Sequence, residues 1–193
     1  MLVVAIVPIS YFAGALAAML RQWAFCFALG AAALAAVGRP GWIPATQLGL
    51  VPSRFDVRGQ LLAGSACLAL ILVLAAVFPG QPSSLPVASV ESAWLSQALF
   101  FLTLVALPAF FEELFFRGAL QRLLTLRWGP YPAIVLASLA FALFHLYAGL
   151  QGMVFALVMG LCLGTVAYRA GSLREVMLVH AINNSLVFAW QAS

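Results

Sequence analysis

Residues 95–118 read LSQALFFLTLVALPAFFEELFFRG, an apolar run whose last third carries Glu112, Glu113 and Arg117. A helix needs about 20 apolar residues to cross the hydrocarbon core of a bilayer, which is about 30 Å thick. The run is long enough to do so. It therefore predicts a membrane-spanning helix with charged side chains at a depth where such groups are costly.

Further apolar runs of similar length occur on both sides of this stretch, at residues 2–20, 23–38, 60–78, 131–146, 150–168 and 174–190. Together they predict an all-α, polytopic transmembrane helical bundle. Only Arg21 and Gln22 separate the first two runs, so both six and seven spans are open. No stretch is long enough for a soluble domain, and we expect a single membrane domain over 1–193 with a catalytic core at about 95–190.

The composition excludes a water-soluble globule. Of the 193 residues, 65% are hydrophobic and 7% are charged, whereas a soluble domain has about 25% charged residues. The nine basic residues are all arginines, and they are scattered singly between apolar runs. This pattern excludes a nucleic-acid partner, which requires clustered basic residues.

The three cysteines, Cys26, Cys67 and Cys162, each lie inside an apolar run. Their spacing is not that of a disulfide framework or a zinc knuckle. The sequence therefore predicts three unpaired cysteines that fill space in the core or face lipid.

The arginines also predict the orientation of the chain, because cytoplasmic loops of membrane proteins are rich in Arg and Lys. Arginines mark the connections 39–59, 119–130 and 169–173, whereas 79–94 and 146–150 have none. The first three connections are expected in the cytoplasm and the other two outside.

Three of the apolar segments carry polar groups. Glu112 and Glu113 lie on the first, His145 ends the second, and His180 and Asn184 lie on the third. An ionisable group at the centre of a bilayer costs at least ~2.5–3.5 kcal/mol and usually lines a cavity with partners. These segments are therefore the candidate functional region.

Helical spacing separates the roles of these groups. Glu113 and Arg117 are four residues apart and can pair on one helix face. Glu112 is rotated by about 100° and has no such partner, which makes it a candidate general acid or base. His180 and Asn184 are also four residues apart, and their donors suit a developing oxyanion.

Three motifs occur in order, Glu-Glu-x-x-x-Arg at 112–117, Phe-x-x-x-His at 141–145 and His-x-x-x-Asn at 180–184. Together they resemble the signature motifs of the CPBP family. That family comprises CAAX prenyl-protein endopeptidases, bacteriocin-processing and immunity proteins, and related glutamic-type intramembrane proteases.

The resemblance implies an intramembrane endopeptidase with four catalytic residues. Glu112, helped by His145, would activate a water molecule to attack a peptide carbonyl. His180 and Asn184 would stabilise the oxyanion. Because Asn183 stands beside Asn184, the assignment of the amide is open by one residue.

Glu113 and Arg117 would support the site, and a metal is a second open question. Two histidines and two glutamates could bind zinc with an open water position, in which case Glu112, His145 and His180 would be the ligands. A metal-free glutamate mechanism is favoured. Other protease chemistries lack their residues, since the chain has one aspartate and no His-Glu-x-x-His motif.

The expected partner is the membrane together with a peptide or membrane-anchored protein substrate. The compact chain with arginine as its only basic residue resembles bacterial relatives, some of which cleave C-terminal sorting tails of the myxosortase kind. We therefore expect the bacterial inner (plasma) membrane. The alternative is a non-catalytic immunity or scaffold protein, or a small proton-coupled transporter with Glu112 and His145 as a proton relay.

The depths of the two histidines present a difficulty. If their helices begin at the membrane surface at residues 131 and 174, a rise of 1.5 Å per residue puts His145 roughly 21 Å deep and His180 roughly 9 Å deep. A tilted or re-entrant helix before His145, or an early end to the helix of Glu112, would bring them together.

Overall fold

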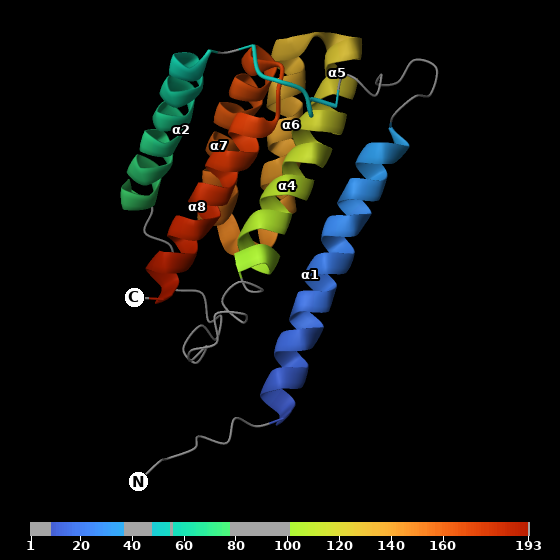
Figure 1. The fold of residues 1–193 in the computed structure, drawn as a ribbon, viewed down its shortest axis with the longest axis vertical. Coiled ribbons are helices and arrows are strands. Elements are labelled where there is room, and N and C mark those ends of the chain that lie inside the picture. The colour runs from blue at the N-terminus through green and yellow to red at the C-terminus, as the bar shows by residue number, and fades with distance from the viewer. Residues whose placement is uncertain (1–8, 37–47, 55, 78–100, 193) are drawn as a thin grey trace.

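The computed structural model describes residues 9–36, 48–54, 56–77 and 101–192. All regular structure in these ranges is helical, which confirms the all-α prediction (Figure 1). The separate long helices are α1 (Ile9–Ala35), α2 (Val57–Val77), α6 (Pro130–Phe144), α7 (Gly149–Ala170) and α8 (Arg174–Ala192). One further rod, which we call the central rod, joins η2 (Leu102–Ala106), α4 (Leu107–Glu113), η3 (Leu114–Leu120) and α5 (Gln121–Trp128).

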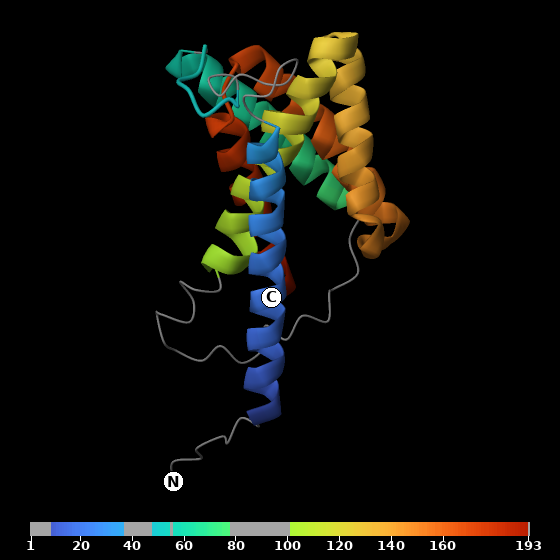
Figure 2. The ribbon, with the colours of Figure 1, turned by 90° about the vertical axis from the view of Figure 1, so that its right-hand side faces the viewer.

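The first two predicted spans form one helix. Helix α1 runs through Arg21 and Gln22 without a break, because both residues are good helix formers and neither a glycine nor a proline stands beside them. Arg21 is exposed on its surface. The N-terminal half of α1 extends well beyond the ends of the other helices (Figure 2). The seven predicted spans therefore correspond to six long helices in the described ranges.

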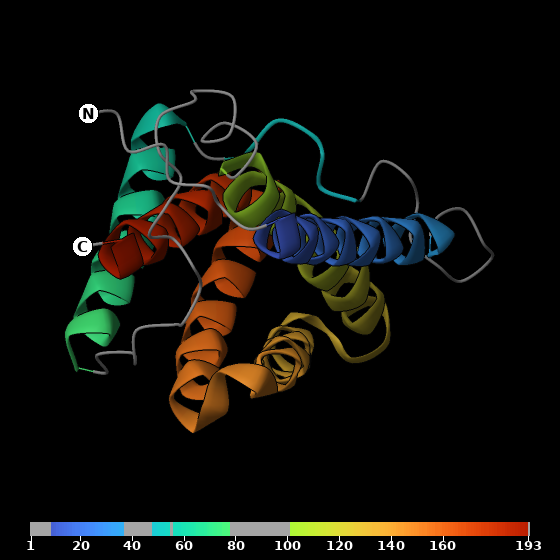
Figure 3. The same ribbon diagram turned by 90° about the horizontal axis from the view of Figure 1, so that it is seen from below.

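The number of membrane spans stays a prediction. Among the described residues, only 146–170 is both long and apolar enough to cross a membrane by itself. Three shorter apolar stretches lie at 20–35, 57–70 and 130–144. Viewed from below, α1 and α2 lie on opposite sides of the bundle, with α7 and α8 between them (Figure 3).

The central rod is longer than predicted. The expected loop at 119–130 is instead helical as far as Trp128, since its leucines, arginines and glutamine all favour helix. Gly129 then reverses the chain at φ +80°, a conformation that glycine adopts without a steric penalty. Pro130 starts α6 directly, so the central rod and α6 form an antiparallel hairpin.

The arginine-bearing connections lie at one end of the bundle, uppermost in Figure 1. There the segment 48–54 attaches to the turn between α7 and α8. The Arg54 N–H donates to Ala170 O at 2.7 Å, and the Leu173 N–H donates to Gly49 O at 2.8 Å. Arg122 donates to Gly171 O at 3.3 Å, which places a positive charge at the negative end of the α7 dipole.

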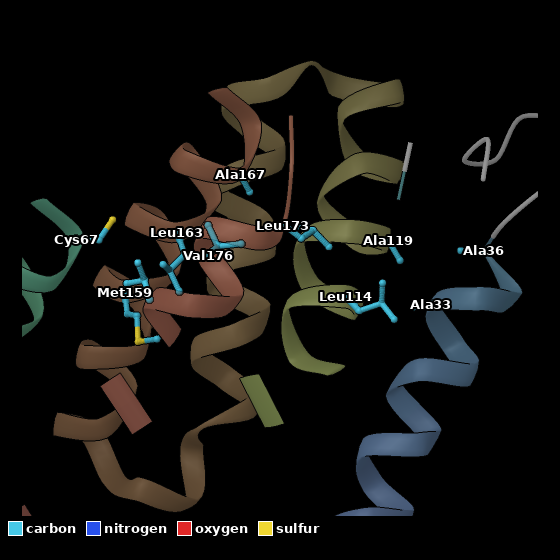
Figure 4. Close-up of a cluster of buried hydrophobic side chains, with 11 residues drawn as sticks. Ala33, Ala36, Cys67, Leu114, Ala119, Met159, Leu163, Ala167, Leu173 and Val176 are labelled. Carbon is cyan, nitrogen blue, oxygen red and sulfur yellow. The ribbon is translucent and has the colours of Figure 1, made fainter. Parts of the chain in front are cut away.

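The hydrophobic core lies where α8, α7 and the central rod meet (Figure 4). Leu163, Leu173 and Val176 are fully buried there. Close packing of α6 on α7 depends on Gly160, because a Cβ at this position would lie 3.2 Å from Ser138 Cα. Small residues of this kind let membrane helices approach closely.

The prediction of three unpaired cysteines is wrong for two of them. Cys67 of α2 and Cys162 of α7 form a disulfide, and Cys26 is free and buried. The paired cysteines are 95 residues apart, and such a pairing depends on how the helices pack rather than on spacing in the sequence.

Candidate active site

The central rod carries the two glutamates into the interior. Glu113 is fully buried, Arg117 is 2% exposed and Glu112 is 7% exposed. The α-helical turns of α4 are flanked by π-helical segments on both sides. Such segments are frequent at functional sites because each changes the direction in which the following side chains point.

Glu113 and Arg117 form the ion pair that their spacing allows. Arg117 Nη1 donates to Glu113 Oε1 at 2.8 Å. The guanidinium also lies over the Phe141 ring, 4.4 Å from its centroid, where the face of the ring attracts a cation. The arginine is thereby held between the central rod and α6.

His180 connects the two carboxylates. Its Nδ1–H donates to Glu113 Oε1 at 2.8 Å, because a carboxylate paired with an arginine can only accept. Its Nε2 faces Glu112 Oε2 at 3.8 Å. The site is therefore a buried series in which carboxylates alternate with basic side chains, in the order Glu112, His180, Glu113 and Arg117.

His145, like His180, lies next to the ring of Phe141. The ring of Phe141 is 4.5 Å from the His145 ring and 6.0 Å from the His180 ring, measured between centroids. The His145 Nδ1–H donates to Phe141 O at 2.9 Å, since a carbonyl oxygen can only accept. In the neutral ring this leaves Nε2 as an acceptor. Within the described ranges, His145 forms no direct ion pair with Glu112 or Glu113.

The predicted difference in depth does not exist, for a reason that the sequence alone did not reveal. Glu113 and His145 each lie 16 residues from Gly129 along the two arms of the hairpin, so they reach the same level. Helix α8 begins below the end of the bundle. Leu173 packs against Gly118, with its Cδ1 3.0 Å from the position of a Cβ there. From there α8 runs antiparallel to the central rod, and this direction brings His180 to the level of Glu113.

The Asn184 side chain accepts a hydrogen bond from its neighbour Asn183. Asn183 is buried and donates from Nδ2 to Asn184 Oδ1 at 3.4 Å, while Asn184 is half-buried. In the described residues no hydrogen bond joins Asn184 to the glutamates or to His180. The ambiguity between the two asparagines therefore stays open.

Sequence reasoning missed the contributions of Phe141 and Tyr147. It identified Phe141 as part of a motif but gave it no contact, whereas the ring touches both histidines and Arg117. Tyr147 lies 5.8 Å from His145 between ring centroids. An aromatic residue two positions after a functional histidine was the available signal.

The zinc alternative finds little support in the placement of the donors. Within the described ranges, no three His, Cys, Asp or Glu side chains are arranged to hold a metal ion. The Nδ1 atoms of His145 and His180 are both occupied by protein acceptors, so a metal could be bound only through their Nε2 atoms. Among the described residues, Glu112, His145 and His180 as placed do not form a common ligand set.

Comparison with known proteins finds one family to which part of the chain is similar. Residues 94–186 match the family model described as type II CAAX prenyl endopeptidase Rce1-like. The matched segment includes the three polar motifs, at 112–117, 141–145 and 180–184. No curated protein and no solved structure matches the chain.

Proposed function

We propose that this chain, whose residues 94–186 match a prenyl endopeptidase family, is an intramembrane endopeptidase that uses Glu112 to activate water. The observation that carries the proposal is the buried series formed by Glu112, His180, Glu113 and Arg117. Charged groups at this depth are costly and are kept where they serve a site.

The two histidines differ in the role that their hydrogen bonds favour. His145 directs Nδ1–H to a backbone carbonyl, so its Nε2 can accept a hydrogen bond from water. His180 directs Nδ1–H to the Glu113 carboxylate, and in the form with both ring nitrogens protonated its Nε2–H can donate as well. His145 is therefore suited to orient the attacking water beside Glu112, and His180 is suited to bind an oxyanion.

The reaction follows from these roles. A water molecule donates its hydrogens to Glu112 and to His145 Nε2, and its oxygen attacks the carbonyl carbon of the substrate. One proton passes to Glu112 as the new C–O bond forms. The negative charge on the carbonyl oxygen is stabilised by His180 and the Asn184 amide. Glu112 then gives its proton to the amide nitrogen, and the C–N bond breaks.

Unsatisfied polar atoms support a hydrated site. Glu113 Oε2, Arg117 Nη2 and Asn183 Oδ1 are buried and make no hydrogen bond within the described ranges. Buried polar groups in proteins are nearly always paired with protein or with ordered water. Water bound at these atoms would satisfy them, which is consistent with a site that also admits the nucleophilic water beside Glu112.

We propose a C-terminal segment of a membrane-anchored protein as the substrate. The family match points to this class because its description names CAAX endopeptidases. A bacterial sorting tail of the myxosortase kind is the form that we favour, with the enzyme in the bacterial plasma membrane. The segment must bind in extended form, because a helix hides the scissile carbonyl in its own hydrogen bonds.

The test is replacement of the base without change of shape. Purified protein in detergent or nanodiscs is incubated with two probes, an internally quenched peptide ending in a prenylated CAAX-type sequence and a tagged membrane protein with a sorting tail. We expect Glu112→Gln to reduce cleavage by at least a thousandfold. The matched control Glu175→Gln, in a buried glutamate of α8 away from the site, is expected to keep wild-type activity.

The same experiment separates the alternatives. Wild-type protein that cleaves neither probe but binds one of them equally well with Glu112→Gln is the result expected of an immunity or scaffold protein. Flux of protons across vesicles that is lost in the variant is the result expected of a transporter. Either outcome contradicts the protease proposal.

A further inference from the structure

The chain makes a tight turn directly after His145, and Tyr147 lies in this turn. Helix α6 ends at His145, and a 3-10 turn, η4 (Leu146–Ala148), follows at once. The turn is closed by the Ala148 N–H, which donates to His145 O at 2.9 Å. Gly149 then reverses the backbone at φ +73° and starts α7. The position of Tyr147 relative to His145 is thus set by the backbone.

Tyr147 is the exposed member of the cluster around the site. Its side chain is 81% exposed, whereas Glu113, Arg117 and His180 are at most 3% exposed. Its ring lies 5.8 Å from the His145 ring at an interplanar angle of 31°. Tyr147 therefore lies at the edge of the site where a substrate can reach it.

The hydroxyl of Tyr147 has no protein partner in the described part of the chain. The side-chain contact that the structure records for this residue is the ring contact with His145. A phenol is a neutral hydrogen-bond donor. In a site of low dielectric, an extended peptide needs donors for its carbonyl groups, since each unpaired carbonyl costs free energy.

We propose that Tyr147 is a substrate-contacting residue whose hydroxyl donates a hydrogen bond to the carbonyl oxygen of the scissile peptide bond. The inference rests on the proposed protease function and adds a third donor to the oxyanion site. The ring lies beside that of His145, 5.8 Å away between centroids, and the exposed hydroxyl can approach the carbonyl from the open side of the site. As the carbonyl oxygen gains negative charge during attack by water, this hydrogen bond becomes stronger.

The test compares variants that separate the hydroxyl from the ring. Tyr147→Phe removes the donor and keeps the ring, and Tyr147→Ala removes both. Removal of one oxyanion donor reduces kcat by about a hundredfold to a thousandfold in a well-studied protease. Here we expect a tenfold to hundredfold loss in kcat for Tyr147→Phe, with KM changed less than threefold, because the bond strengthens in the transition state.

The matched control is Tyr131→Phe. Tyr131 is 77% exposed and lies near the start of α6, at the opposite end of that helix. Its variant is expected to cleave the quenched peptide at the wild-type rate. Wild type, Glu112→Gln and the three tyrosine variants are compared at equal expression and with equal thermal stability in detergent.

The outcomes for the inference and for the proposed function are distinct. If wild type cleaves, Glu112→Gln does not, and Tyr147→Phe keeps the wild-type kcat, the inference is wrong and the proposed function stands. A slow Tyr147→Ala beside a normal Tyr147→Phe leads to the same conclusion, because the ring alone would then matter. Equal activity of wild type and Glu112→Gln overturns both.

Discussion

Among the site residues, we expect replacement of Arg117 to lower the stability of the folded protein most. Its guanidinium neutralises the fully buried Glu113 and lies on Phe141. Removing one partner of a buried ion pair leaves an uncompensated charge and costs about 3–5 kcal/mol. We predict that Arg117→Met lowers the stability of the purified protein, measured as the midpoint of thermal unfolding in detergent.

A double variant tests whether charge is the cause. Glu113→Gln combined with Arg117→Met removes both charges and keeps the approximate volume. We expect it to recover most of the lost stability but not the activity, because His180 loses the carboxylate that accepts from its Nδ1. Equal destabilisation in the single and double variants would instead assign the loss to the packing of Arg117 on Phe141.

The pairing of Glu113 with Arg117 shows which contacts can be predicted from residue spacing. Two positions four residues apart on one helix are neighbours whatever surrounds them, so this contact could be predicted. The contact between His180 and Glu113 spans 67 positions. It depends on the height along the bundle at which α8 begins relative to the central rod. No local sequence pattern encodes that height.

At the level of elements, hydropathy predicted the helices well and their ends poorly. Each apolar run corresponds to a described helix, but the run at 95–118 continues to Trp128. Two neighbouring runs also join across Arg21. An arginine marks a polar position but does not stop a helix. Gly129 with Pro130 does stop one, and this pair positions His145 opposite Glu113.

The contact between α6 and α7 leads to a prediction about Gly160. A Cβ at this position would lie 3.0 Å from Ser138 Cβ and 3.2 Å from Ser138 Cα. The Cα cannot move without shifting α6, which also carries Phe141 against His180 and Arg117. We therefore predict that Gly160→Ala lowers both the thermal midpoint and the rate of peptide cleavage.

The control for this prediction is Gly64→Ala in α2. A Cβ there would meet only Val179 Cγ2, at an ordinary distance of 3.6 Å. Because alanine favours helix over glycine by about 1 kcal/mol, this variant should match or exceed the wild-type midpoint. If Gly160→Ala behaves like Gly64→Ala, α6 and α7 are not held at the distance that the structure gives.

For the whole molecule, α2 is joined to the rest by packing and by one covalent bond. Helix α2 lies at the edge of the bundle beside α8 (Figure 1), and Cys67 bonds to Cys162 of α7. The described contacts place α2 against α7 and α8 rather than against the central rod. The disulfide thus holds an outer helix to α7, which packs against two of the helices that carry the site, α6 and α8.

The disulfide predicts a defined number of reactive thiols. In protein denatured without reductant, a maleimide-polyethylene glycol should add once per chain, at Cys26, the free cysteine. After reduction it should add three times, since the chain has three cysteines. A native disulfide typically contributes about 2–4 kcal/mol, so reduction or Cys67→Ala should lower the thermal midpoint by several degrees.

The control Cys26→Ala keeps the disulfide, so reduction should lower its midpoint as much as that of wild type. Three additions without reductant would show that α2 is held by packing alone.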